Sequence, residues 1–206
     1  HALYAECIAV MAEKWGPQRS FILTSLSKQQ SYISLEQKIE LLAEVAFRMQ
    51  KERTSLNKQS MLARKQVEDL IAEMLENEFH KSIPKEEKNP TQFYKRQAVS
   101  LLDDIHQKQG VLVEKGYERE VDDVLIAFAH LSFQEYLAAW YIDKKQQFSI
   151  LCDHLVHPAW NEVVKLYRAM TGNSDILRRM LDEETTQQPD GLLLAAACHA
   201  EYSEKI

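Results

Sequence analysis

The feature of the sequence that most constrains its fold is a change of apolar pattern at Gly110. Before this glycine, apolar residues recur with the 3.6-residue period of amphipathic helices. After it, two short segments, 111–113 and 124–128, carry β-branched or aromatic residues and are joined by the polar stretch 114–123. Such a pair predicts a β-hairpin. With few glycines and prolines elsewhere, the fold class is predicted to be mainly α with one short β-hairpin.

The helix predicted over residues 34–50 has a clear beginning. Ser34 precedes Gln37 by three residues, which is the spacing of a capping box. In this motif each side chain binds the main-chain N–H of the other residue, and the first turn of the helix is stabilised.

Two further helices are predicted before the hairpin. The first begins between residues 60 and 64 and ends at Asn77, and the second covers 91–109. The second ends at Gly110, because glycine readily adopts the left-handed conformation found after a last helical turn. Three helices followed by a hairpin are the arrangement of a winged-helix domain, which we assign to residues 34–142.

The beginning of the chain predicts a separate helix. Residues 2–15 carry one apolar stripe, which ends at Gly16 and Pro17. We assign residues 1–33 to the end of a first helical domain and its linker. Because the chain starts inside this helical pattern, we expect it to belong to a longer protein.

Short helices are predicted in the last part of the chain, separated by polar turns. They cover 148–154, 160–170, 175–181 and 191–202. We assign residues 143–206 to a second helical domain or to the start of sensor helical repeats.

The segment 128–142 combines a strand end, a turn and a helix. Ser132 is predicted to be the N-cap of this helix, with Glu135 completing a second capping box. We interpret Gln134 and Glu135 as structural residues. The apolar face of the helix is predicted to contain Phe133, Tyr136, Leu137, Trp140 and Tyr141.

The charge of the chain bears on a role that winged helices often have, the binding of nucleic acid. The net charge is −6, whereas binding to phosphates requires clustered Lys and Arg. Lys95, Arg96 and Lys108 lie on the predicted helix 91–109, but so do Asp103 and Asp104. A winged-helix nucleic-acid-binding module is therefore the alternative hypothesis, and we expect no nucleic-acid partner.

The remaining polar and sulfur-containing residues do not indicate a metal or disulfide site. Cys7, Cys152 and Cys198 are far apart in apolar surroundings, which is typical of buried thiols in a reducing compartment. His154 and His157 have a spacing used for metal binding but lack a convincing third ligand. No apolar run approaches the roughly 20 residues of a membrane span. A cytoplasmic location is predicted.

Several segments together carry a family resemblance. They are Leu3-Tyr4, Trp15 and Arg19, the run Glu36–Ala46, Leu101-Leu102 with Ile105 and Gly110–Glu114, the block Phe128–Ala139, and Trp160–Val164. These segments resemble the region C-terminal to the nucleotide-binding core in NACHT-type STAND NTPases, the NOD-like receptors of animals and their bacterial relatives. The most specific part is the block that contains Phe128, His130, Ser132, Phe133, Gln134, Glu135 and Tyr136.

The resemblance implies a function for His130. In the resting state of the family, ADP is clamped between the nucleotide-binding domain and the winged helix, and the histidine at this position reaches the phosphates. An imidazole near phosphate oxygens forms a charge-assisted hydrogen bond, which depends on the number of phosphates. The alternative interpretation is a histidine that forms a hydrogen bond within the domain core.

The sequence also lacks parts that the family's activity requires. It contains no Gly-x-x-x-x-Gly-Lys-Ser/Thr phosphate loop, so we expect the chain to have no catalytic residue, cofactor or enzymatic activity of its own. ADP or ATP with magnesium would bind to the intact parent protein. The resemblance implies a regulatory segment that controls ADP-locked and active oligomeric states in innate immunity or antiphage defence. Its partners would be the nucleotide-binding domain of the same chain, further copies on activation, and an unknown ligand on the downstream repeats.

Overall fold

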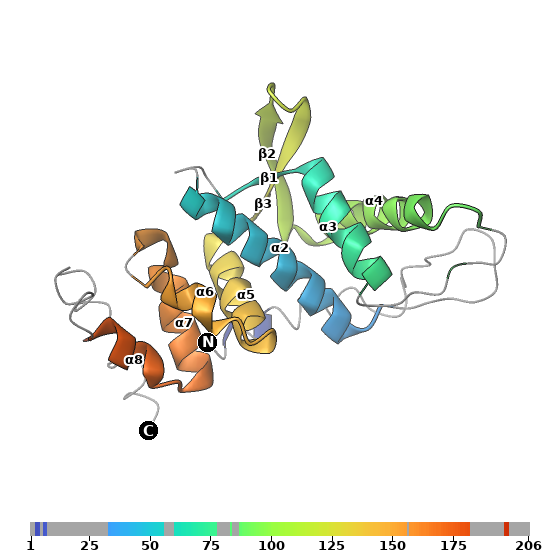
Figure 1. Cartoon of the computed structure of the whole chain (residues 1–206). Helices are drawn as coiled ribbons and strands as arrows, with labels where there is room; N and C mark the ends of the chain where they lie inside the picture. Colours follow the sequence, from blue (N-terminus) through green and yellow to red (C-terminus); the bar gives the residue numbers. More distant parts are fainter. Residues whose placement is uncertain are drawn as a thin grey trace.

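The computed structural model describes residues 3–4, 6–7, 33–55, 60–77, 83, 87–155, 157–181 and 196–197 (Figure 1). The helices predicted at 2–15 and 191–202 lie almost entirely outside these residues. Among the helices described, none is long and apolar enough to cross a membrane.

The first long helix, α2 (Leu35–Ser55), confirms the predicted capping box. The Ser34 N–H donates to Gln37 Oε1 at 3.0 Å, and the Gln37 N–H donates to Ser34 Oγ at 3.1 Å. Both bonds satisfy main-chain donors that would otherwise have no partner in the first turn. The helix is longer than predicted and includes Arg53 in its last turn.

The other helices of the winged-helix unit are α3 (Arg64–Asn77) and α4 (Pro90–Gln109). The Asn89 side chain caps α4 by accepting from the Gln92 N–H at 3.1 Å. Gly110 ends the helix with φ of 61°, a left-handed conformation that glycine adopts without the steric cost of a Cβ atom. The predicted C-cap is confirmed.

The predicted hairpin consists of β2 (Leu112–Glu118) and β3 (Asp123–Phe128), paired antiparallel. The sheet contains one strand that was not predicted, β1 (Leu62–Ala63), which pairs antiparallel with β3 and gives the order β1-β3-β2. Two residues are too few to show an alternating pattern. The mainly-α winged-helix fold is confirmed, with this short edge strand added.

The helix after the hairpin, α5 (Leu131–Lys144), occupies a central position. In Figure 1 it lies between α2 on one side and α7 on the other. The short elements that follow are α6 (Phe148–Cys152), the 3-10 turn η2 (Pro158–Trp160), α7 (Asn161–Thr171) and α8 (Asp175–Met180). Short helices joined by turns were predicted for this part of the chain.

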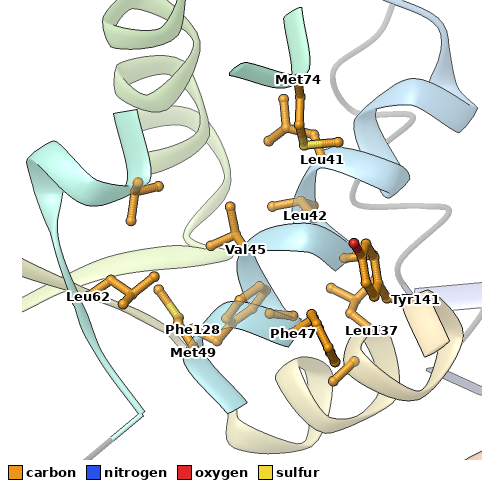
Figure 2. Packing of buried hydrophobic residues seen from close by; sticks show 14 of the residues in the cluster. Leu41, Leu42, Val45, Phe47, Met49, Leu62, Met74, Phe128, Leu137 and Tyr141 are labelled. Atoms are coloured by element: carbon orange, nitrogen blue, oxygen red, sulfur yellow. The ribbon is translucent and has the colours of Figure 1, made fainter. Parts of the chain in front are cut away.

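The core joins the winged helix to these downstream helices. Figure 2 shows Phe47 of α2 against Leu137 and Tyr141 of α5, and the Phe47 and Tyr141 rings are stacked with centroids 4.6 Å apart. Buried residues of α7, including Val163, belong to the same hydrophobic cluster. Burial of this apolar surface, at about 25 cal/mol per Å², fixes α5 between its two neighbours.

Candidate interdomain surface at the start of α5

His130 lies at the point where β3 ends and α5 begins. The Ala129 N–H donates to the Val111 carbonyl at 2.9 Å, which is the last hydrogen bond across the strands. His130 follows as the N-cap of α5 in an extended conformation, and its side chain forms no capping hydrogen bond. The residue is exposed, so the interpretation of His130 as a core histidine is wrong.

Aromatic side chains position the imidazole. The His130 and Phe133 rings meet edge to face, with centroids 5.5 Å apart and planes at 83°. Phe133 in turn contacts the Tyr4 ring edge to face at 6.2 Å, and Tyr4 stacks on Tyr136 at 5.8 Å. Such aromatic contacts have preferred geometries, so they restrict the imidazole to a limited set of orientations.

The prediction that Ser132 caps this helix with Glu135 is wrong. The helix begins at Leu131, which places Ser132 inside the first turn, and the cap residue is His130. The physical reason is the sheet: because β3 continues to Phe128 and Ala129 still bonds to Val111, the first residue free to cap is His130. The spacing of Ser132 and Glu135 alone does not show at which residue the strand ends and the helix can begin.

Gln134 is a buried polar residue, with a relative exposure of 1%. Its Nε2 donates to Gln50 Oε1 of α2 at 3.0 Å. Gln50 is also buried and donates through its Nε2 to the Ala159 carbonyl of η2 at 2.6 Å. A buried amide needs such partners, because an unsatisfied polar group in the core costs about 1–3 kcal/mol.

Glu135 binds a second residue of α2. The Arg53 Nη1 lies 3.1 Å from Glu135 Oε1 and also donates to the Ala159 carbonyl at 3.3 Å. Burial raises the pKa of the Glu135 carboxyl group, while Arg53 acts in the opposite direction. The interpretation of Gln134 and Glu135 as structural residues agrees with these contacts, although no capping box is involved.

Sequence reasoning missed the two residues of α2 that complete this network. Gln50 follows the buried residues Ala46 and Phe47 by four and three positions, so a polar residue occupies an apolar register position. A polar residue at such a position was the one sequence signal that could have indicated a buried hydrogen bond. Arg53 carried no such signal because the predicted helix stopped before it.

The histidines considered as metal ligands have other contacts. His154 Nδ1 lies 2.8 Å from the Ile150 carbonyl, and its ring stacks on Trp160 at 4.5 Å. His157 Nδ1 accepts from the Ala159 N–H at 3.2 Å. Within the described ranges, no group of three or more His, Cys, Asp or Glu side chains could hold a metal ion.

Two cations of α4, Lys95 and Arg96, are paired with carboxylates. Lys95 Nζ lies 3.0 Å from Asp69 Oδ1, and Arg96 pairs with Glu87. Asp103, on the same helix, pairs with Arg64 of α3. The Lys108 side chain is outside the described part of the structure. A phosphate backbone on this helix would therefore compete with existing ion pairs.

The fold and this surface define a class of protein: a winged-helix domain that continues directly into further helices and exposes a histidine at the junction. The family of winged helix-turn-helix domains C-terminal to NACHT matches residues 1–142, and the chain belongs to this family. It is thus a NACHT-associated winged-helix domain. Comparison with curated proteins and with solved structures gave no significant match.

Proposed function

We propose that this domain is a regulatory lid on the nucleotide-binding NACHT domain of the same polypeptide. In the resting state it would dock there and hold ADP in place, with His130 donating a hydrogen bond to a phosphate oxygen. The observation that carries the proposal is the exposed imidazole at the start of α5, oriented by Phe133. Leu131 beside it is 42% exposed and offers an apolar contact to the docked domain.

The position of His130 suits an anion. It precedes the first turn of a 14-residue helix, where unpaired N–H groups and the helix dipole favour negative charge. An imidazole that donates to an ionised oxygen forms a stronger bond than a neutral pair, worth about 1.5–3 kcal/mol. A contact of this size is large enough to bias a switch between a closed and an open state.

The activities of the intact protein follow from this proposal. Binding of ATP and magnesium would belong to the NACHT domain, because this sequence has no phosphate loop, and the chain itself would not be an enzyme. A ligand on the downstream helices would release the lid, and the open protein would assemble with further copies. The output would be signalling in innate immunity or antiphage defence, in the cytoplasm.

The alternative function, nucleic-acid binding, has less support. Lys95 and Arg96 already contact carboxylates, and the net charge of the chain is −6. Breaking these pairs would offset much of the gain from binding phosphates. A duplex DNA shift at about 50 mM salt that disappears at higher salt would favour this alternative over the lid.

The lid is tested in the intact protein that carries the NACHT domain. His130→Phe retains a ring against Phe133 but has no donor, whereas His130→Gln retains a donor. We expect His130→Phe to accelerate ADP dissociation by about tenfold or more, and His130→Gln to accelerate it less, as the energy of a charge-assisted hydrogen bond requires. Equal ADP retention in the wild type and in His130→Phe would contradict the proposal.

A further inference from the structure

We infer that Gln50, Arg53 and the Ala159 carbonyl form a joint that couples the downstream helices to α5 and thereby to His130. This inference rests on the proposed function of His130, but the joint itself is built from contacts within the described structure. It identifies where a change in the helices α6 to α8 would reach the lid.

The joint links three elements: α2 and η2 meet at the Ala159 carbonyl, and α5 binds the α2 side chains that reach it. Two donors from α2, Gln50 Nε2 at 2.6 Å and Arg53 Nη1 at 3.3 Å, converge on the Ala159 carbonyl of η2. Each donor side chain is held by one of two consecutive residues of α5, since Gln134 binds Gln50 and Glu135 binds Arg53. A displacement of η2 therefore changes the surroundings of both α5 residues together.

Burial makes this joint respond as a unit. Gln50 is fully buried and Gln134 nearly so, hence neither amide can exchange its partner for water when the carbonyl moves. Leaving them unsatisfied would cost about 1–3 kcal/mol for each group, so a partly broken network is unfavourable. The joint is expected to be either closed or fully open.

A large part of the contact between α5 and the downstream helices is different in kind. Trp160, Val163 and Val164 are completely buried apolar side chains. Apolar contacts are non-directional and tolerate small shifts, whereas hydrogen bonds lose strength steeply with misalignment. The joint therefore adds directional contacts to this apolar packing, and the charges of Glu162 and Lys165 on α7 also act on Glu135.

The distance from the joint to His130 is short. Glu135 lies five positions after His130, which corresponds to about 7.5 Å along a helix of 1.5 Å rise per residue. Tyr136, the next residue, stacks on Tyr4, and Phe133 contacts the imidazole itself. A rigid helix transmits a displacement over this length with little loss.

The test uses the 206-residue chain and amide hydrogen exchange, with no nucleotide present. Pro158→Gly loosens η2, because proline fixes φ at the first residue of this turn. We expect exchange of the α5 amides at 133–138 to accelerate about fivefold, and we expect Pro158→Gly to add no further acceleration in an Arg53→Met background. Pro90→Gly is the matched control, since Pro90 is likewise exposed and opens α4, and it should leave the α5 amides unchanged.

Two outcomes overturn the joint. If Pro158→Gly accelerates α5 exchange equally with and without Arg53→Met, the coupling runs through apolar packing. If it accelerates nothing in α5, η2 is not coupled to this helix. Gln50→Met repeats the test from the other donor should Arg53→Met fail to fold. ADP retention is not measured here, so failure of the joint and failure of the lid are distinguishable.

Discussion

The Arg53 guanidinium lies 3.1 Å from the Glu135 carboxylate, although 82 positions separate these residues in the sequence. The pair joins the last turn of α2 to the second turn of α5, and Glu135 has only 7% relative exposure. Removing two charges from water is costly, so such a pair adds little net stability compared with an apolar contact. Its consequence is asymmetric: the buried Glu135 carboxylate is poorly tolerated without Arg53, whereas the more exposed Arg53 keeps a second acceptor in the Ala159 carbonyl.

The first prediction concerns this asymmetry. Arg53→Met leaves a buried carboxylate without its cation and should lower the free energy of unfolding by about 3 kcal/mol. Glu135→Gln keeps a hydrogen-bond acceptor, while Arg53 retains the Ala159 carbonyl, so its cost should be about 1 kcal/mol. Urea unfolding at pH 7 measures both values. A larger loss for Glu135→Gln than for Arg53→Met would contradict this account of the pair.

The pH dependence of stability should differ in sign between two glutamates. Burial raises the pKa of Glu135 above 4.5, so the folded state holds this proton more tightly than the unfolded state. Stability contributed by the protonated carboxyl group is present below pH 4.5 and is lost as pH rises through the raised pKa. Compared with Glu135→Gln, the wild type should therefore lose stability as pH rises above 4.5.

Glu36 provides the opposite case. The Lys144 ammonium group, 2.8 Å away, lowers the pKa of Glu36 below 4.5. The stability from this ion pair is present above pH 4.5 and is lost as pH falls through the lowered pKa. Unfolding curves of the wild type, Glu36→Gln and Glu135→Gln across pH 3 to 7, about the range where carboxyl groups titrate, should show these opposite trends. Parallel pH profiles for the two variants would exclude this assignment.

The sequence predicted those parts of the fold that local patterns determine. Ser34 and Gln37 lie in the same helix start, so their capping box depends on neighbours three residues apart. The strand Leu62–Ala63 was missed because it exists only through its pairing with Leu125 and Ile126, far along the chain. Local propensity contains no information on such pairing.

The same distinction explains the outcome at the candidate site. The position of His130 between strand and helix was predictable from the change of period, and its exposure was not. Ser132 fits a capping pattern, but the length of β3, set by pairing across the sheet, places the cap two residues earlier. The partner of Glu135 is Arg53, and only the packing of α2 on α5 brings these two residues together.

A further prediction compares the two serines. Ser34→Ala removes the Oγ that accepts from the Gln37 N–H at 3.1 Å, and it should cost about 1 kcal/mol. Ser132→Ala should change stability by less than about 0.5 kcal/mol, because Ser132 is not the cap of α5 and alanine favours the helix interior. For a chain of this size, Ser34→Ala should lower Tm by about 2–4 °C. An equal loss in Ser132→Ala would restore that residue as a cap.

The last prediction concerns Arg64, which joins three elements of the winged helix. Its guanidinium pairs with Asp103 of α4, with Glu68 of α3 at 2.8 Å and, at 3.8 Å, with Glu114 of β2. Asp103 and Glu68 raise the pKa of the Arg64 guanidinium, with the Asp103 hydrogen bond as the largest cause.

Arg64→Met should lower the free energy of unfolding by about 2 kcal/mol, because a network around a partly buried guanidinium exceeds the usual surface pair. Lys95→Met is the matched control: its pair with Asp69 is more exposed, with 55% of the lysine side chain accessible against 24% for Arg64. It should cost at most about 0.5 kcal/mol. Raising the salt concentration should reduce the effect of Lys95→Met more than that of Arg64→Met, since exposed charges are screened more strongly. Equal costs and equal salt dependence for the two variants would mean that Arg64 acts as an ordinary surface cation, and the three elements would then be held by their apolar packing alone.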